Sequence, residues 1–167
     1  MARLHGQQPT MPMHLPTGSL FSGGDAGPEG TGPTDWEPQH LFSPARGRYT
    51  VLVVDDQAAK RYAIARALRA AGYAVDEAPS GAAALQAFGH HAAVVLDVYL
   101  PDLDGFAVCR ALRLRAPALP IVQVSSVLVD AQYQQAGRAA GASAYLADPE
   151  LTALVATVDQ LLGVRIE

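Results

Sequence analysis

The stretch that decides the fold is VVLDVYLPDLDGFAVCRALR, residues 94–113. Its first three residues complete an apolar run, residues 92–96, that ends directly before Asp97. This pattern is typical of a buried parallel strand. After a short turn, Asp104 stands where a helix N-cap is expected, and apolar residues then recur at helical spacing. A carboxylate directly after an apolar run costs free energy unless it has partners. Asp97 is therefore the first candidate for a functional residue, whereas Asp104 is better explained as a helix cap.

The same alternation of apolar runs and helical stretches extends from Tyr49 towards the end of the chain. We expect strands at 50–54, 73–77, 92–96, 120–124 and 143–146, and helices at roughly 58–71, 80–88, 104–115, 130–140 and 149–162. Ser80 and Asp130 also stand at N-cap positions, and Gly72, Gly89 and Gly141 follow helices. Five strands alternating with five helices predict an α/β doubly wound sheet, for which 2-1-3-4-5 is one of two common strand orders.

Residues 1–48 have a different composition from the rest of the chain. They contain seven of the twelve prolines and eight of the fifteen glycines, with no helical or strand period. Such a segment buries too little apolar surface to offset the entropy of ordering it. We therefore expect a disordered tail over 1–48 and one domain over 49–167, with no separate output domain after the last helix.

The overall composition restricts the classes of partner and compartment. The net charge of −4 argues against broad binding to nucleic acids or anionic membranes, which favour basic surfaces. The chain has neither an apolar run long enough to span a membrane nor a signal-peptide core. Its single cysteine, Cys109, excludes an internal disulfide and lies on an apolar helix stripe. We expect a buried core thiol and a cytoplasmic protein.

Acidic residues follow two of the expected strands at the point where each strand ends. Asp55 and Asp56 follow the first strand and Asp97 follows the third. In a doubly wound sheet, ligands bind beyond the carboxyl ends of the strands, so these side chains converge if the two strands are neighbours. Converging carboxylates repel one another, and a divalent cation such as Mg²⁺ removes that cost with the oxygen ligands it prefers. For Asp56, the alternative that it only caps the following helix stays open.

These features occur in four segments that together resemble a known family. The segments are VLVVDD (51–56), VVLDVYLPDLDGFAVCRALR (94–113), PIVQVSS (120–126) and AGASAYLADP (140–149). They resemble the receiver domains of response regulators in two-component (phosphorelay) signalling, in particular receivers associated with hybrid sensor histidine kinases. The resemblance covers residues 50 to about 163 and implies a flavodoxin-like (βα)5 fold with strand order 2-1-3-4-5.

The resemblance also implies a set of roles for the acidic residues. Asp97 would accept a phosphoryl group from a histidine kinase or a phosphotransfer protein. Asp56 and Asp97 would bind Mg²⁺ directly, Asp55 through water, and Tyr99 would add its backbone carbonyl. Ser125 would hydrogen-bond the phosphoryl group.

Tyr145 matches the aromatic residue that switches with the phosphoryl-binding hydroxyl, although it could also be an ordinary core residue, and Ser125 an ordinary loop serine. The resemblance implies a cytoplasmic phosphoprotein, a single-domain response regulator that signals through altered protein contacts. It would be no enzyme beyond its own phosphorylation. The downstream target is unknown, and a homodimer stays open.

One position departs from the family pattern. Asp148 precedes Pro149 where the family has a lysine that pairs with the phosphoryl oxygens. A carboxylate within about 4 Å of a phosphoryl group would repel it by several kcal/mol. Asp148 could instead point to solvent as a first-turn acid of the last helix. Lys60, the only lysine in the chain, lies on the sheet-facing stripe of the first helix and is a hypothetical replacement cation, although it could also snorkel to water.

Two other functions remain alongside the phosphorylated receiver. Because Asp148 replaces the lysine, the chain could be a pseudo-receiver that acts as a phosphorylation-independent docking module. An aspartate-nucleophile phosphatase is less well supported, because such enzymes need a second acid where this chain has Tyr99. We expect the neighbouring His90 and His91 to be an exposed loop pair.

Overall fold

The computed structural model describes residues 42–165. Its sheet contains five parallel strands: β1 Thr50–Val54, β2 Ala74–Ala78, β3 Ala93–Asp97, β4 Ile121–Ser125 and β5 Ala144–Ala147. The helices are η2 Pro44–Arg48 (a 3-10 helix), α1 Ala58–Ala71, α2 Gly81–Ala87, α3 Gly105–Arg115, α4 Ala131–Ala140 and α5 Leu151–Leu162. The strand order β2-β1-β3-β4-β5 confirms the predicted flavodoxin-like (βα)5 fold. Within the described range, no helix is both long and apolar enough to cross a bilayer.

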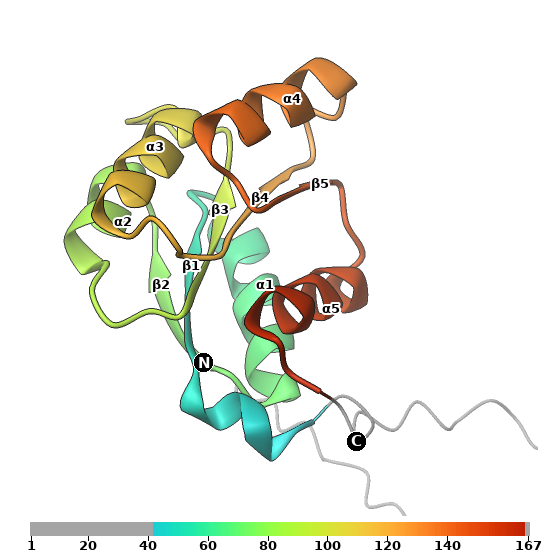
Figure 1. The fold of residues 1–167 in the computed structure, drawn as a ribbon. Helices are drawn as coiled ribbons and strands as arrows, with labels where there is room; N and C mark the ends of the chain where they lie inside the picture. Colours follow the sequence, from blue (N-terminus) through green and yellow to red (C-terminus); the bar gives the residue numbers. More distant parts are fainter. Residues whose placement is uncertain (1–41, 166–167) are drawn as a thin grey trace, which may run out of the picture. The chain divides into compact units, whose positions relative to one another are not determined.

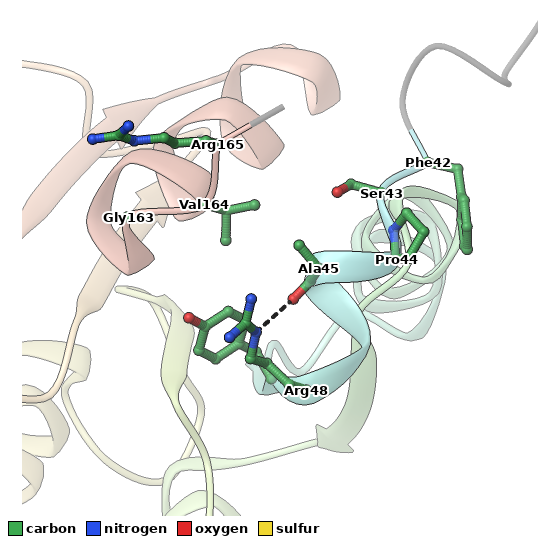
Figure 2. Close-up of a pocket in the computed structure, with 9 residues that line it drawn as sticks. Phe42, Ser43, Pro44, Ala45, Arg48, Gly163, Val164 and Arg165 are labelled. Carbon is green, nitrogen blue, oxygen red and sulfur yellow. Dashed lines mark hydrogen bonds between the residues drawn. The ribbon is translucent and has the colours of Figure 1, made fainter. Parts of the chain in front are cut away.

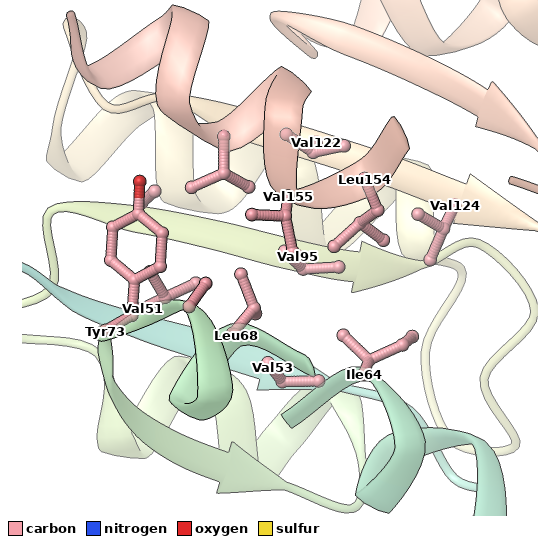
Figure 3. Close-up of a cluster of buried hydrophobic side chains, with 13 residues drawn as sticks. Val51, Val53, Ile64, Leu68, Tyr73, Val95, Val122, Val124, Leu154 and Val155 are labelled. Atoms are coloured by element: carbon pink, nitrogen blue, oxygen red, sulfur yellow. The ribbon is translucent and has the colours of Figure 1, made fainter. Parts of the chain in front are cut away.

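Helices cover both faces of the sheet (Figure 1). The side chains of Val51 and Val53 pack with α1 and α5 in one buried cluster, shown in Figure 3. Leu52 and Val54 belong to a second buried cluster, with residues of α2, α3 and α4. Successive residues of a strand point to opposite faces, so a strand that is covered on both faces must be apolar at every position. This explains the continuous apolar runs of β1 and β3.

The helix ends in the structure largely agree with the predicted capping residues. Gly72 and Gly141 end α1 and α4 with φ of 111° and 99°, a left-handed conformation that glycine adopts without steric cost. Ser80 caps α2, where its hydroxyl accepts a hydrogen bond from a first-turn amide. At the other end, α2 stops at Phe88 in an extended conformation, so Gly89 is not its cap.

The expected boundary between tail and domain at residue 48 needs a correction. Residues 44–48 form η2, and the side chain of Arg46 within it is fully buried. Because Arg46 is buried, the folded domain includes η2. An open hollow of about 530 Å³ lies between η2 and residues 163–165, as Figure 2 shows. The rest of the expected tail, residues 1–41, lies outside the described range.

Arg46 joins the start of the domain to its last helix. Its Nε and Nη2 atoms donate hydrogen bonds to the two carboxylate oxygens of Asp159, at 2.8 Å and 2.6 Å. Its Nη1 atom donates to the carbonyl of Ala71 at 2.8 Å. The Tyr73 hydroxyl donates to the same Asp159 carboxylate at 2.6 Å. This carboxylate raises the pKa of Arg46, against the opposing effect of burial, so the arginine stays charged in the core.

Candidate functional site

Three carboxylates converge at the carboxyl end of the sheet. Asp55 follows β1, Asp97 is the last residue of β3, and β1 and β3 are paired neighbours. One carboxylate oxygen of each of Asp55, Asp56 and Asp97 lies within 4.8 Å of the others. Asp55 and Asp97 are buried, at 0% and 2% exposure, whereas Asp56 is exposed. The structure thus brings the three predicted acids together in one place.

The ammonium group of Lys60 lies between two of these acids. Its Nζ atom is 3.1 Å from Asp55 Oδ2 and 3.2 Å from Asp97 Oδ1. Lys60 is in the first turn of α1, on the same stripe as the buried residues Ile64 and Leu68. That stripe faces the sheet, so a long side chain at its start reaches the ends of β1 and β3. The structure thus places Lys60 beside the acids, and its role as a replacement cation stays a prediction.

Burial and the neighbouring charges shift the pKa values of Asp97 and Lys60 in different directions. Burial raises the pKa of Asp97, Lys60 lowers it, and Asp55 and Asp56 raise it again, with a net rise above the ordinary value. For Lys60, burial lowers the pKa, but Asp97 and Asp55 outweigh burial and the pKa lies above its ordinary value. Lys60 therefore stays protonated near neutral pH, while a further cation near Asp97 would favour the ionised carboxylate.

Asp55 directs one carboxylate oxygen to the backbone and the other to Lys60. Its Oδ1 atom accepts a hydrogen bond from the Gln57 amide at 2.9 Å. Its Oδ2 atom is buried and accepts no hydrogen bond from the described residues, although it forms the ion pair with Lys60. Buried polar atoms normally have a partner. Two more carboxylates lie beside this oxygen, and three clustered carboxylates are a donor set that fits a hard divalent cation such as Mg²⁺.

Gly105 allows α3 to begin directly against the site. A Cβ atom at Gly105 would lie 2.5 Å from the Asp97 carbonyl oxygen and 2.6 Å from Cα of Val98. The predicted N-cap Asp104 accepts a hydrogen bond from the Phe106 amide at 3.0 Å, which confirms its role as a helix cap. Sequence analysis did not assign Gly105 to the site, although the Asp-Gly pair at the helix start was the signal that could have done so.

Asp102 is a second residue that sequence analysis missed. Its carboxylate accepts hydrogen bonds from the amides of Gly81 and Ala82, at 2.9 Å and 2.8 Å. The backbone amides of Ala82 and Gly81 lower the pKa of this exposed carboxyl. Asp102 thereby ties the turn after Asp97 to the start of α2.

Ser125 and Tyr145 lie on the neighbouring strands β4 and β5. The Ser125 hydroxyl is buried and accepts hydrogen bonds from the amides of Val127 and Leu128, at 3.3 Å and 2.9 Å. The Tyr145 hydroxyl donates to the Leu128 carbonyl at 2.6 Å. Burial raises the pKa of Tyr145, and the neighbouring Ser125 works against this rise. The two predicted residues are therefore linked through the loop after β4.

Asp148 is exposed and lies outside the last helix. Its backbone has φ of 45°, and its amide donates to the Ser125 carbonyl at 2.8 Å. The expectation that it is a first-turn acid of α5 is wrong, because α5 begins at Leu151 with Glu150 as its N-cap. Asp148 instead lines a hollow of about 170 Å³ together with Lys60 and Ser125.

The remaining predicted residues have mixed outcomes. Cys109 is buried as predicted, and burial raises the pKa of its thiol to about 11. The prediction for His91 is wrong, because its side chain is only 1% exposed. Tyr99 is 67% exposed, and its backbone carbonyl as a metal ligand stays a prediction.

Sequence comparisons place these residues in a known family. The family model of the response regulator receiver domain matches residues 51–159. Response regulator MprA of Mycobacterium sp. (strain KMS) is 42% identical over 115 residues, which are 67% of this chain and 50% of that protein. MprA of Mycolicibacterium vanbaalenii is 43% identical over 115 residues, 67% of this chain and 49% of that protein. The chain thus spans about half the length of these curated relatives.

Solved structures agree with the sequence comparisons. A putative response regulator from Chloroflexus aurantiacus has a TM-score of 0.65 at 37% identity, covering 69% of this chain and 98% of that one. The Vibrio cholerae chemotaxis protein CheY4 has a TM-score of 0.64 at 28% identity, covering 68% and 98%. With the matched residues 51–159 containing the acids, Lys60, Ser125 and Tyr145, the chain belongs to the response regulator receiver domain family.

Proposed function

We propose that Asp97 accepts a phosphoryl group from a phosphohistidine of a partner histidine kinase or phosphotransfer protein. Phosphorylation on aspartate is general in this family, whose members are signalling modules of two-component systems rather than enzymes with external substrates. The observation that carries the proposal is the position of Lys60, whose ammonium lies 3.2 Å from the Asp97 carboxylate. It supplies a positive charge at the acceptor, where the family lysine is replaced by Asp148.

The proposed reaction is a displacement at phosphorus. One carboxylate oxygen of Asp97 attacks the phosphorus atom, the bond from phosphorus to the partner's imidazole nitrogen breaks, and the imidazole takes up a proton. The product is an acyl phosphate on Asp97. Charge on the equatorial phosphoryl oxygens must be neutralised as they pass the other carboxylates. The free energy of this step therefore depends on the cations beside Asp97.

Two sources of positive charge fit the site. Receiver domains generally bind Mg²⁺ at the acidic pocket. Here Asp56, Asp97 and the carbonyl of Tyr99 would hold the ion directly and Asp55 through water, and the convergence of the three carboxylates supports this assignment. When bound, Mg²⁺ neutralises charge on the phosphoryl oxygens. Lys60 is the second source, since its flexible side chain can follow the Asp97 oxygen as the phosphoryl group is attached.

The proposed signal passes through Ser125 and Tyr145. If the Ser125 hydroxyl turns to hydrogen-bond a phosphoryl group on Asp97, the hydrogen bonds that it accepts from the amides of Val127 and Leu128 change, and with them the loop that Tyr145 contacts. The Tyr145 ring can take a new position only if its hydroxyl gives up the hydrogen bond to the Leu128 carbonyl. A change of this kind alters the surface formed by α4, β5 and α5 and its affinity for a downstream protein. The single-domain form and the cytoplasmic location stay predictions.

A second function is favoured by Asp148, which lines the same hollow as Lys60 and Ser125. A phosphoryl group carries a charge of about −1.5 to −2, so a nearby carboxylate disfavours it. The chain would then be a docking module that works without phosphorylation.

Incubation with Mg²⁺ and acetyl phosphate, followed by intact-mass measurement, separates the two functions. We expect a single phosphoryl adduct on the wild-type chain and none on Asp97→Asn. A folded wild-type chain that forms no adduct with acetyl phosphate or phosphoramidate would contradict the phosphorylation proposal and favour the docking module.

A further inference from the structure

A second cluster of metal-binding side chains lies away from the acidic site, on the edge strand β2 and the loop before β3. It contains Asp76 of β2 and the adjacent His90 and His91. The Nε2 atom of His91 is 3.0 Å from Asp76 Oδ2, and the Nε2 atom of His90 is 3.6 Å from the same oxygen. We propose that these three residues form a binding site for a zinc-class divalent cation.

The distances between the ligand atoms fit a tetrahedral ion. Zn²⁺ binds imidazole nitrogen and carboxylate oxygen at about 2.0–2.2 Å, which places two tetrahedral ligands roughly 3.3–3.5 Å apart. The two distances to Asp76 Oδ2, 3.0 Å and 3.6 Å, bracket this separation. All three ligand atoms lie within 4.8 Å of one another. Small rotations of His90 and Asp76 therefore complete a three-ligand site.

One ligand is held in place before any ion binds. The His91 side chain is 1% exposed, and its ring stacks on Phe88 at 6.1 Å and on His90 at 4.6 Å, measured between ring centroids. The side chains of His90 and Asp76 are 70% and 54% exposed. The site thus combines a fixed ligand with two adjustable ones and opens to solvent, so that water can complete the coordination.

Binding through Nε2 of His91 has a small structural cost. The Nδ1 atom of His91 accepts a hydrogen bond from the Gly89 amide at 3.4 Å. A metal on Nε2 requires the proton on Nδ1, so this hydrogen bond is lost. At 3.4 Å it is long and weak. The hydrogen bond from His91 Nε2 to Asp76 Oδ2, at 3.0 Å, is also lost, and the shared metal ion takes its place between the two side chains.

The proposed ion is chemically and spatially distinct from Mg²⁺ at the acidic site. Imidazole ligands select Zn²⁺, Cu²⁺ or Ni²⁺, whereas Mg²⁺ prefers oxygen donors. His91 precedes β3 and Asp97 ends it, so six residues of extended chain, about 20 Å, separate the two sites. An ion bound here ties the loop before β3 to the edge strand β2 without touching the phosphoacceptor.

Titration of the full chain with ZnCl₂ in excess Mg²⁺, followed by calorimetry, tests the proposal. We expect one equivalent of Zn²⁺ to bind to the wild-type chain and equally well to Asp97→Asn. His90→Ala and Asp76→Asn should each weaken binding by about tenfold or more. Because both side chains are exposed, circular dichroism should show that these variants stay folded.

The matched control removes the other histidines of the chain, His5, His14 and His40. Their combined replacement by alanine should leave the affinity unchanged. Substituting Co²⁺ for Zn²⁺ should give the visible absorption bands of a tetrahedral nitrogen–oxygen site, and these bands should disappear in His90→Ala. The proposal is overturned if the wild-type chain binds no Zn²⁺, if His90→Ala binds it as tightly, or if Asp97→Asn abolishes binding.

Discussion

Replacing Arg46 with alanine should destabilise the whole domain, although the residue lies in a segment whose composition resembles a linker. The guanidinium is fully buried and makes three hydrogen bonds of 2.6–2.8 Å to Asp159 and Ala71. Its removal leaves the Asp159 carboxylate in the core with the Tyr73 hydroxyl as its remaining hydrogen-bond donor among the described residues. An uncompensated buried charge is the source of the expected loss.

The magnitude follows from the type of contact. Removing one partner of a buried ion pair costs about 3–5 kcal/mol, out of a total stability of roughly 5–15 kcal/mol for a domain. With a urea m-value of about 2 kcal/mol per molar, the unfolding midpoint should fall by about 1.5–2.5 M. The melting temperature should fall by about 10–20 °C.

Equilibrium urea unfolding, followed by circular dichroism, measures this loss. Arg48→Ala is the matched control, because Arg48 belongs to the same 3-10 helix but is exposed. It should change the free energy of unfolding by less than about 1 kcal/mol. Arg46→Ala combined with Asp159→Ala should lose less than the sum of the two single variants. A loss below about 1 kcal/mol for Arg46→Ala would refute the conclusion that η2 is part of the folded domain.

Three further substitutions test the site. Asp97→Asn should raise the stability of the domain near pH 7, because the pKa of Asp97 is raised in the fold and its ionised form therefore costs stability there. This gain should fade as the pH falls towards the ordinary pKa of 3.8. A variant that is less stable than wild type at pH 7 would contradict this. Gly105→Ala should cost about 1–3 kcal/mol in thermal unfolding, because its Cβ would lie 2.5 Å from the Asp97 carbonyl oxygen, whereas an unchanged melting temperature would mean that α3 shifts freely. Asp148→Lys should lengthen the lifetime of the phosphoryl group on Asp97, measured by mass after removal of the donor, and a shorter lifetime would show that Asp148 does not repel it.

Much of the fold follows from local patterns in the sequence. β1 and β3 are buried on both faces, so their apolar runs are continuous and their ends are predicted within one residue. Because the two strands are neighbours, the acids that follow them converge, and this part of the site was predictable too. Lys60 was identified by its position on the sheet-facing stripe of its helix.

Contacts between distant parts of the chain were not predictable in this way. Arg46 pairs with Asp159, 113 residues later. The segment around Arg46 is held to the domain by this buried ion pair, so its sequence has no apolar period that would predict a folded element. His91 is buried because it stacks on Phe88 and pairs with Asp76, a residue of the edge strand β2. The Asp-Gly pair at the helix start marks Gly105, but the closeness of its Cα to the Asp97 carbonyl depends on how α3 packs against the end of β3.

The rate of phosphorylation in Lys60 variants tests the central claim most directly. Wild type, Lys60→Ala and the control Arg66→Ala, which removes an exposed cation from the same helix, are incubated with Mg²⁺ and acetyl phosphate and sampled by intact mass over time. We predict an adduct on wild type and Arg66→Ala at equal rates, and formation about 100-fold slower in Lys60→Ala, because a charge beside the reacting oxygens is lost. Equal rates in wild type and Lys60→Ala would contradict the account, and so would a folded wild-type chain that forms no adduct on Asp97.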